Sequence, residues 1–217
     1  MKRATIIAAV AVVAGAVGWD AVEFAGGYNA FPLVLGFFPA SLFLFGFTAL
    51  ASCVAAIVAL VALFRRRLRY ALLLAFTLVA CWLISPWFAG RSAFLLGLAT
   101  RLHHLSSPDE IRAAAQTSLS AMPSGGQIFG PRKVMGPKPE EAEQSQRGWS
   151  AISRFSFVHL DGDTCVVFVR PPEVSFTWGG ALPGHWGILV GTPPPPQRYF
   201  YQQTIRFADG VILFRGE

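Results

Sequence analysis

The sequence predicts a membrane protein in which two to three N-terminal transmembrane α-helices are followed by a small extracytoplasmic α+β domain. Three observations predict this fold class: two long apolar runs without a charge, a basic segment between them, and strand-like alternation in the C-terminal part. Hydrophobic residues make up 53% of the 217 residues and charged residues only 14%. This balance is unusual for a soluble domain.

Two apolar runs of membrane-spanning length dominate the first 90 residues. They cover Ser41 to Phe64 and Tyr70 to Ala89 and contain no Asp, Glu, Lys, Arg or His. About 20 apolar helical residues cross a hydrocarbon core of ~30 Å, and backbone groups without water must pair within the segment. We therefore predict helical spans over residues 41–64 and 70–89. Transport and redox roles carried by this chain alone are disfavoured, because they need ionisable or ligating side chains in the membrane.

Basic residues give the predicted orientation. Residues 65–69, the short link between the two runs, contain four arginines, and short loops of this kind stay in the cytoplasm. We therefore expect a cytoplasmic N-terminus in the bacterial inner (plasma) membrane and a periplasmic or extracellular C-terminal domain. Most of the formal net charge of +6 lies at these membrane ends. The remaining charges are mixed in sign, so we expect no nucleic-acid partner.

A third apolar stretch, Ala4 to Trp19, follows the basic start of the chain. It fits either a short first span over residues 4–19 or a signal peptide cleaved near residue 16. Small residues four apart, such as Ala11 and Gly15, favour a retained helix that packs against another. Residues 20–40 contain acids, glycines and prolines, so we predict a loop there.

A stripe of small residues marks one face of the predicted 41–64 helix. Ala51, Ala55 and Ala59 recur every four residues and therefore lie on the same side of the helix. Small side chains allow helix backbones to approach closely in a membrane. We expect this stripe to pack against a neighbouring helix, most simply the 70–89 span.

The segment after the spans predicts three further elements. Residues 91–105 have the pattern of an amphipathic helix, which lies either in the membrane interface or beneath the folded domain. The domain itself covers residues 106–217. It begins with a helix over residues 108–122, for which Ser107 is the N-cap and Pro108 the first residue. Residues 123–148 are rich in proline and glycine and predict a long loop.

From Trp149 onward, alternating apolar residues predict six short strands. The first two, residues 152–159 and 164–169, form a hairpin around the turn residues Asp161 and Gly162. Four more are predicted over residues 174–178, 186–190, 199–207 and 211–214. Without helical crossovers between them, these strands predict an antiparallel β-meander with the 108–122 helix on one face.

Residues that could carry chemistry gather around the predicted hairpin turn. His159 with Asp161 or Asp163 could bind a metal, and Cys165 with a histidine could act as a nucleophile. Aspartates are, however, common in tight turns for backbone reasons, and a cysteine in an apolar strand usually packs in the core. We therefore predict no catalytic residue, no metal site and no cofactor.

The most distinctive stretch places Trp178, His185 and Trp186 among four glycines. These three residues are the candidate contacts for a partner or a small ligand, since tryptophan is a frequent anchor at interfaces. The structural alternative is that both tryptophans fill the core, because both fall on the alternating apolar face of their strands.

These features together predict a non-catalytic integral membrane protein. We expect an accessory or structural subunit that anchors an extracytoplasmic interaction domain to a larger membrane assembly, with membrane lipid and membrane proteins as partners. The alternative is a sensor or ligand-binding module built on the Trp178–Trp186 region. A weaker alternative is an extracytoplasmic enzyme that uses Cys165 or histidines.

Overall fold

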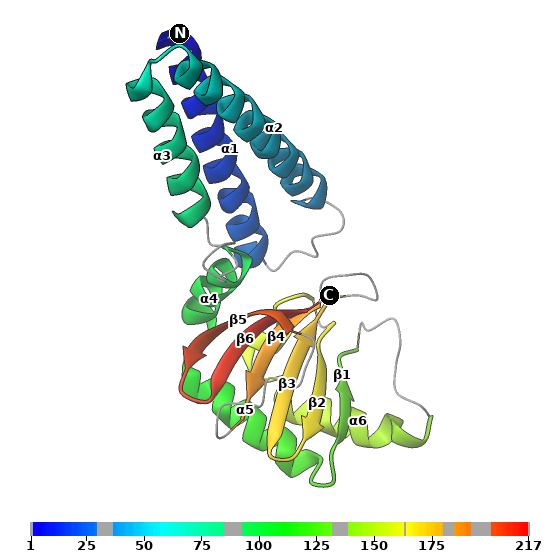
Figure 1. Cartoon of the computed structure of the whole chain (residues 1–217). Coiled ribbons are helices and arrows are strands. Elements are labelled where there is room, and N and C mark those ends of the chain that lie inside the picture. Colours follow the sequence, from blue (N-terminus) through cyan, green and yellow to red (C-terminus); the bar gives the residue numbers. More distant parts are fainter. Residues whose placement is uncertain are drawn as a thin grey trace. The chain divides into compact units, whose positions relative to one another are not determined.

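The chain is described by a computed structural model that forms two compact units (Figure 1). The structure describes residues 2–29, 37–84, 93–131, 139–162, 164–179, 185–191 and 201–216. One unit comprises residues 1–26 and 33–94, and the other comprises residues 27–32 and 95–217. We call the first the helical unit and the second the sheet domain.

Three helices make up most of the helical unit: α1 (Lys2–Asn29), α2 (Phe37–Phe64) and α3 (Leu68–Ile84). Two of them, α1 and α2, are long and apolar enough to cross a membrane, and α3 is a shorter apolar helix. The predicted span over residues 41–64 is thus present as the long helix α2. The second long helix is α1, for which the sequence predicted a short span over residues 4–19 or a signal peptide, and the predicted 70–89 span corresponds to the shorter α3. The end of the last predicted span, residues 85–89, lies outside the described residues.

The predicted loop over residues 20–40 is wrong at both ends. Helix α1 continues ten residues past Trp19 to Asn29, and α2 begins at Phe37. Asp20 and Glu23 are polar but compatible with a helix, and a helical glycine costs only about 1 kcal/mol. No proline interrupts α1, so these weak signals do not end it. Residues 30–36 lie outside the described part.

A tight turn joins α2 to α3. Arg66 has a φ of 54°, in the left-handed region. The N–H of Arg66 donates to the carbonyl oxygen of Leu63 at 2.9 Å, and the N–H of Arg67 donates to that of Ala62 at 2.8 Å. This pair of hydrogen bonds closes a helix end in a Schellman motif. The arginine-rich link is therefore an ordered helix cap.

The sheet domain contains six antiparallel strands: β1 (Gly126–Phe129), β2 (Val166–Arg170), β3 (Glu173–Trp178), β4 (Trp186–Val190), β5 (Tyr201–Ala208) and β6 (Val211–Gly216). Their order in the sheet is β1-β2-β3-β4-β6-β5. The antiparallel sheet is confirmed. The meander holds only from β1 to β4, because β6 lies between β4 and β5.

The predicted first strand, residues 152–159, is wrong. Ile152 ends helix α6 (Pro139–Ile152), and the 3-10 helix η1 (Ser156–His159) follows. Phe157 and Val158 are adjacent and both buried, which a strand with one buried face does not allow. The turn at Gly162 is present, with a φ of 58°, but it connects η1 to β2.

The predicted loop over residues 123–148 is wrong as well, because it supplies both β1 and most of α6. The edge strand β1 pairs with β2, with Ile128 opposite Val167. Residues 132–138 lie outside the described part. A four-residue strand that begins at a glycine offers too short a pattern for recognition from sequence.

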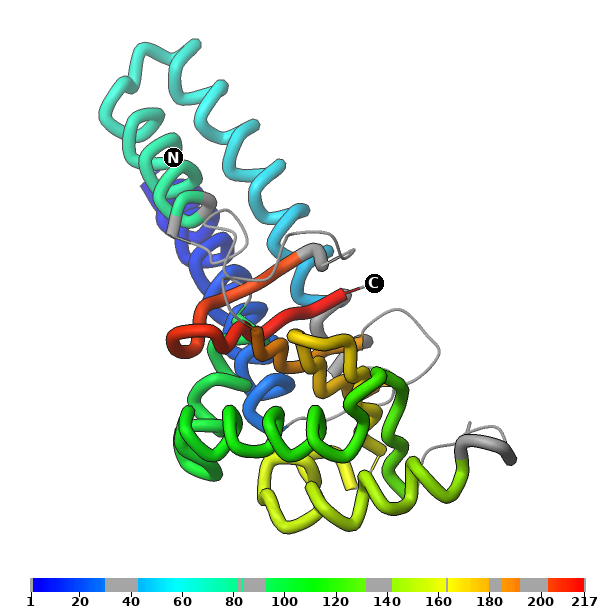
Figure 2. The backbone as a smooth tube through the Cα atoms, turned by 90° about the horizontal axis from the view of Figure 1, so that it is seen from below, coloured from blue at the N-terminus to red at the C-terminus, as the bar shows by residue number. Residues whose placement is uncertain are grey.

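Helices α5 (Pro108–Ala121) and α6 cover one face of the sheet, as Figures 1 and 2 show from two directions. The predicted start of α5 is confirmed: the Ser107 side chain accepts a hydrogen bond from the Glu110 N–H, and the Glu110 carboxylate accepts one from the Ser107 N–H. Helix α6 approaches β1 closely, because a Cβ at Gly148 would lie 2.8 Å from Cδ1 of Ile128.

Helix α4 (Ala93–Leu105) is the predicted amphipathic helix of residues 91–105. Its apolar face is buried within the chain at Phe94, Leu95, Leu98 and Leu102. In the sheet domain, the ring of His103 stacks on that of Phe207 in β5, with 4.3 Å between centroids. This burial favours the alternative in which the helix packs on the folded chain.

Candidate functional site

Trp178 and Trp186 form a stacked pair in the core of the sheet domain. They face each other across β3 and β4, and their ring centroids lie 4.9 Å apart with 15° between the planes. Their exposed fractions are 0% and 1%. Trp178 also donates its indole N–H to the carbonyl oxygen of Val158 at 3.3 Å. A ligand could reach these rings only if the core opened, so the arrangement favours the core-filling alternative.

His185 is the half-buried member of the candidate trio. Its carbonyl oxygen accepts a hydrogen bond from the Gly216 N–H at 2.8 Å, and its ring meets the Phe214 ring edge-on at 6.2 Å. A Cβ at Gly216 would clash with the imidazole. The histidine therefore packs over the end of β6, and a role in partner contact stays a prediction for this residue.

The residues around the turn that connects η1 to β2 have structural partners. Nε2 of His159 lies 2.5 Å from the carbonyl oxygen of Ser153, and Thr164 donates its hydroxyl to the Asp161 carboxylate at 2.9 Å. Cys165 is fully buried. Among the described residues, no three His, Cys, Asp or Glu side chains form a group that could hold a metal ion. Asp163 lies outside these residues.

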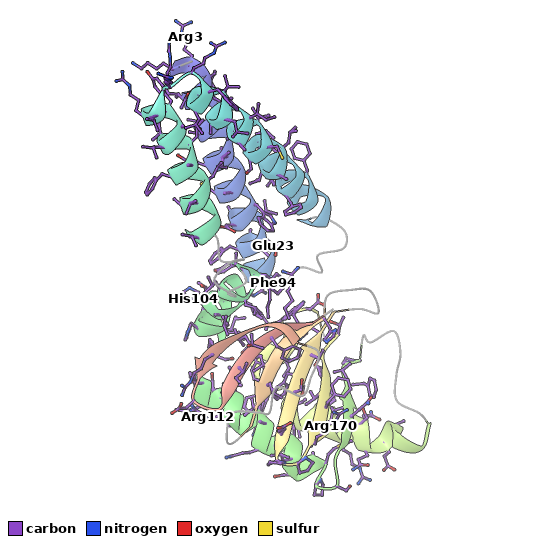
Figure 3. The ribbon with its side chains drawn as sticks, in the orientation of Figure 1. Arg3, Glu23, Phe94, His104, Arg112 and Arg170 are labelled. Carbon is purple, nitrogen blue, oxygen red and sulfur yellow. The ribbon has the colours of Figure 1, made fainter. Side chains whose placement is uncertain are left out.

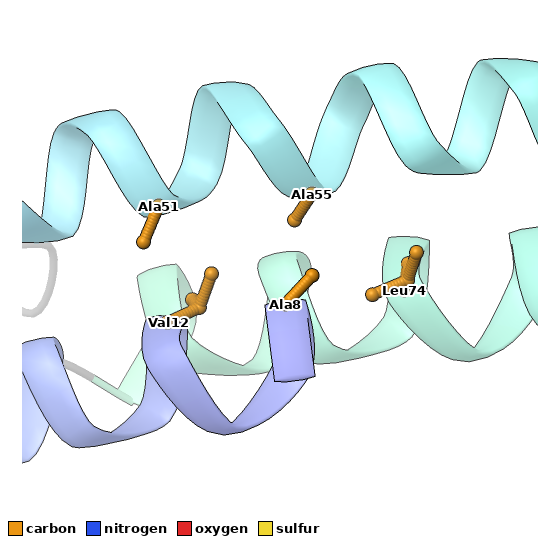
Figure 4. Packing of buried hydrophobic residues seen from close by; sticks show 5 residues of the cluster. All are labelled: Ala8, Val12, Ala51, Ala55 and Leu74. Carbon is orange, nitrogen blue, oxygen red and sulfur yellow. The ribbon is translucent and has the colours of Figure 1, made fainter. Parts of the chain in front are cut away.

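The small-residue stripe packs as an internal seam of the helical unit. Ala51 and Ala55 are buried against Ala8 and Val12 of α1 and Leu74 of α3 (Figure 4). Ala59 is partly buried at the edge of this cluster. The stripe thus contacts α3, as the sequence predicted for the 70–89 span, and also contacts α1.

Helix α1 also approaches α2 through its own small residues. A Cβ at Gly15 would lie 2.5 Å from Oγ1 of Thr48, and one at Gly18 would lie 3.4 Å from the Leu44 side chain. Trp19 meets Phe45 edge-on at 5.4 Å. The two helices are therefore antiparallel neighbours, which places the start of α1 at the same end of the unit as the α2–α3 turn.

The outer surface of the helical unit is apolar. All but two of the large apolar side chains that are exposed in the described part of the chain lie on α1, α2 and α3; the exceptions are Leu96 and Leu105 on α4. A water-soluble bundle buries such side chains and presents polar ones. This surface is a candidate interaction surface, and it suits contact with lipid.

An apolar groove runs between α1 and α2 on this surface, with a volume of about 420 Å³. Ile7, Ala8 and Ala11 line it on α1, and Leu50, Ala51 and Val54 line it on α2. The periodicity of a single helix predicts which face carries small residues. It does not predict which two helices leave a gap between them. Sequence reasoning therefore missed the groove.

The two ends of α1 differ in charge (Figure 3). Lys2 and Arg3 are exposed at its start, and Glu23 lies near its other end. Between Glu23 and Asp109 the sequence contains no acidic residue. The start of α1 and the α2–α3 turn therefore form a wholly basic end of the helical unit.

Comparisons with known proteins do not add to this description: a scan against family models, a search of curated proteins and a search of solved structures each found no match.

Proposed function

We propose that this chain is a non-catalytic integral membrane protein, an accessory subunit that anchors the sheet domain outside the cytoplasm and joins a larger membrane assembly. The observation that carries the proposal is the outward-facing apolar surface of α1, α2 and α3. Such a surface is stable against hydrocarbon and unstable in water, since each buried CH₂ contributes about 0.8 kcal/mol.

The distribution of charge supports the proposed orientation. Lys2, Arg3 and the arginines of the α2–α3 turn occupy one end of the unit, and this is the end that the positive-inside bias keeps in the cytoplasm. Retention of α1, in place of cleavage as a signal peptide, is supported by its close packing on α2 at Gly15.

The groove between α1 and α2 supports the role of accessory subunit. A partner's transmembrane helix with small residues on one face would fill it, and its large rim side chains, Ile7 and Leu50, would contact that helix on both sides. The alternative of a ligand-binding module has less support, because Trp178 and Trp186 are already packed against each other.

The proposal is tested by native mass spectrometry of the particle extracted from its own membrane in mild detergent. The wild-type chain should carry a stoichiometric protein companion. The double variant Ile7→Ala, Leu50→Ala should lose it, because it removes both rim contacts of the groove. A matched control, Val10→Ala with Leu60→Ala, truncates exposed side chains of the same helices that do not line the groove.

The control variant should keep the companion. A bare monomer or homo-oligomer from the wild-type chain would contradict the accessory role. Loss of the companion from both variants would contradict the assignment to the groove.

A further inference from the structure

The basic end of the helical unit carries six cationic side chains: Lys2, Arg3, Arg65, Arg66, Arg67 and Arg69. All six are exposed. No acidic side chain lies near them in the helical unit, because Asp20 and Glu23 are far along α1, about 26 Å and about 30 Å from Arg3 at 1.5 Å per residue. Within the described residues of the helical unit, no acidic side chain near this end neutralises the charge.

Backbone hydrogen bonds fix the turn that carries these arginines. The Schellman hydrogen bonds hold Arg65, Arg66 and Arg67 at the end of α2, and Arg66 occupies the left-handed position of the motif. Glycine is the usual residue there, because it has no Cβ to cause strain. The chain places an arginine at this position, which adds a guanidinium in the middle of the turn.

Large apolar side chains flank these arginines on both sides. Phe64 precedes them with 85% of its surface exposed, and Leu68 follows Arg67 with 59% exposed. A ligand that matches this surface has a negatively charged head and an apolar body. Free phosphate or a nucleic acid would match only the arginines.

We propose that the basic end of the helical unit binds an anionic phospholipid. Its phosphate contacts the guanidinium groups of the α2–α3 turn, which suit phosphate because they offer paired N–H donors. Its acyl chains lie along Phe64 and Leu68. The inference rests on the proposed placement of this unit in a membrane. It adds that the unit prefers lipids with an anionic headgroup.

The test uses the purified full-length chain in non-ionic detergent, with native mass spectrometry as the readout. Phosphatidylglycerol and phosphatidylcholine of the same chain length are added in turn, and the lipid-bound fraction is measured. The wild-type chain should retain phosphatidylglycerol in preference to phosphatidylcholine. The double variant Arg65→Gln, Arg67→Gln should lower the affinity for phosphatidylglycerol about 25-fold, since each basic residue near a membrane contributes about fivefold.

Matched variants separate a specific contact from an effect of net charge or folding. Arg147→Gln with Arg170→Gln removes the same charge from exposed positions of the sheet domain and should leave lipid binding unchanged. Lys2→Gln with Arg3→Gln leaves the turn intact and should still weaken binding. Equal binding of the two lipids by the wild-type chain, or equal losses in the turn and sheet-domain variants, would overturn the inference.

A competition with glycerol phosphate distinguishes lipid from a soluble anion. Millimolar glycerol phosphate should fail to displace phosphatidylglycerol, because it lacks the acyl chains that contact Phe64 and Leu68; full displacement would contradict a lipid site. A micelle has no inside or outside, so this result does not depend on orientation. A negative result for lipid binding in detergent would leave the proposed membrane insertion intact. Failure of the chain to insert into a membrane would be detected separately, in cells.

Discussion

Close backbone contacts at single glycines determine how the sheet is packed. A Cβ at Gly187 in β4 would clash with the carbonyl oxygen of Phe176 and would lie 2.6 Å from Cζ of Phe214. Phe214 in β6 is the cross-strand partner of this glycine, and its ring lies directly over it. The space that another residue would fill is therefore already occupied by a buried aromatic ring.

We predict that Gly187→Ala lowers the free energy of unfolding of the sheet domain by about 3 kcal/mol, because the methyl group would displace backbone or the buried Phe214 ring. The measurement is urea unfolding of the detergent-solubilised chain, followed by the near-ultraviolet circular dichroism of the tryptophans. Gly191→Ala is the control, since among the described residues its Cβ would meet the flexible Glu173 side chain, with Cγ at 3.2 Å. Equal effects of the two substitutions would contradict the argument.

At the scale of elements, α5 depends on its N-terminal cap. Ser107→Ala removes the oxygen that accepts the Glu110 N–H at 3.2 Å, so we expect a loss of about 1 kcal/mol in the same unfolding measurement. Ser120→Ala, at an exposed position near the end of α5, is the control and should change the stability by less than about 0.5 kcal/mol. A cap that contributes nothing would give the same result for both variants.

The elements predicted correctly are those with strong local signals. The capping residues of α5 and the alternation Val174, Phe176, Trp178 in β3 each specify one type of structure. The errors occur where local signals are weak or ambiguous. Helix α6 begins at Pro139 in a polar segment, and its burial against β1 depends on Gly148, which sequence patterns treat as a helix breaker.

The candidate site could be predicted only in part, for a related reason. The alternation in β3 correctly placed Trp178 on the apolar face, but its stacking on Trp186 depends on the register of two strands. The groove between α1 and α2 depends on how whole helices cross. Such long-range features are set by tertiary packing, which a single sequence does not encode in its local pattern.

At the scale of the whole molecule, the proposed topology can be measured directly in cells. A cysteine introduced at Ser120, which is exposed on α5, should react with a membrane-impermeant maleimide in intact cells or spheroplasts. Cys53 and Cys81 are replaced by serine in this background, and the buried Cys165 is kept. A cysteine at Arg67, in the α2–α3 turn, is the control, which should react only after lysis if the proposed orientation is correct. Labelling in the reverse pattern would invert the proposed orientation.

The position of β6 in the sheet has a consequence for the order in which the domain is made. Strand β5 is synthesised before β6, yet among the described strands it pairs with β6 alone, and β6 also completes the pairing of β4. Until residues 211–216 have left the ribosome, β5 has no strand to join and β4 has one open edge. The sheet therefore closes in a single late step, and a nascent chain that stalls before residue 211 would present the unpaired β5 and the open edge of β4 to chaperones and proteases.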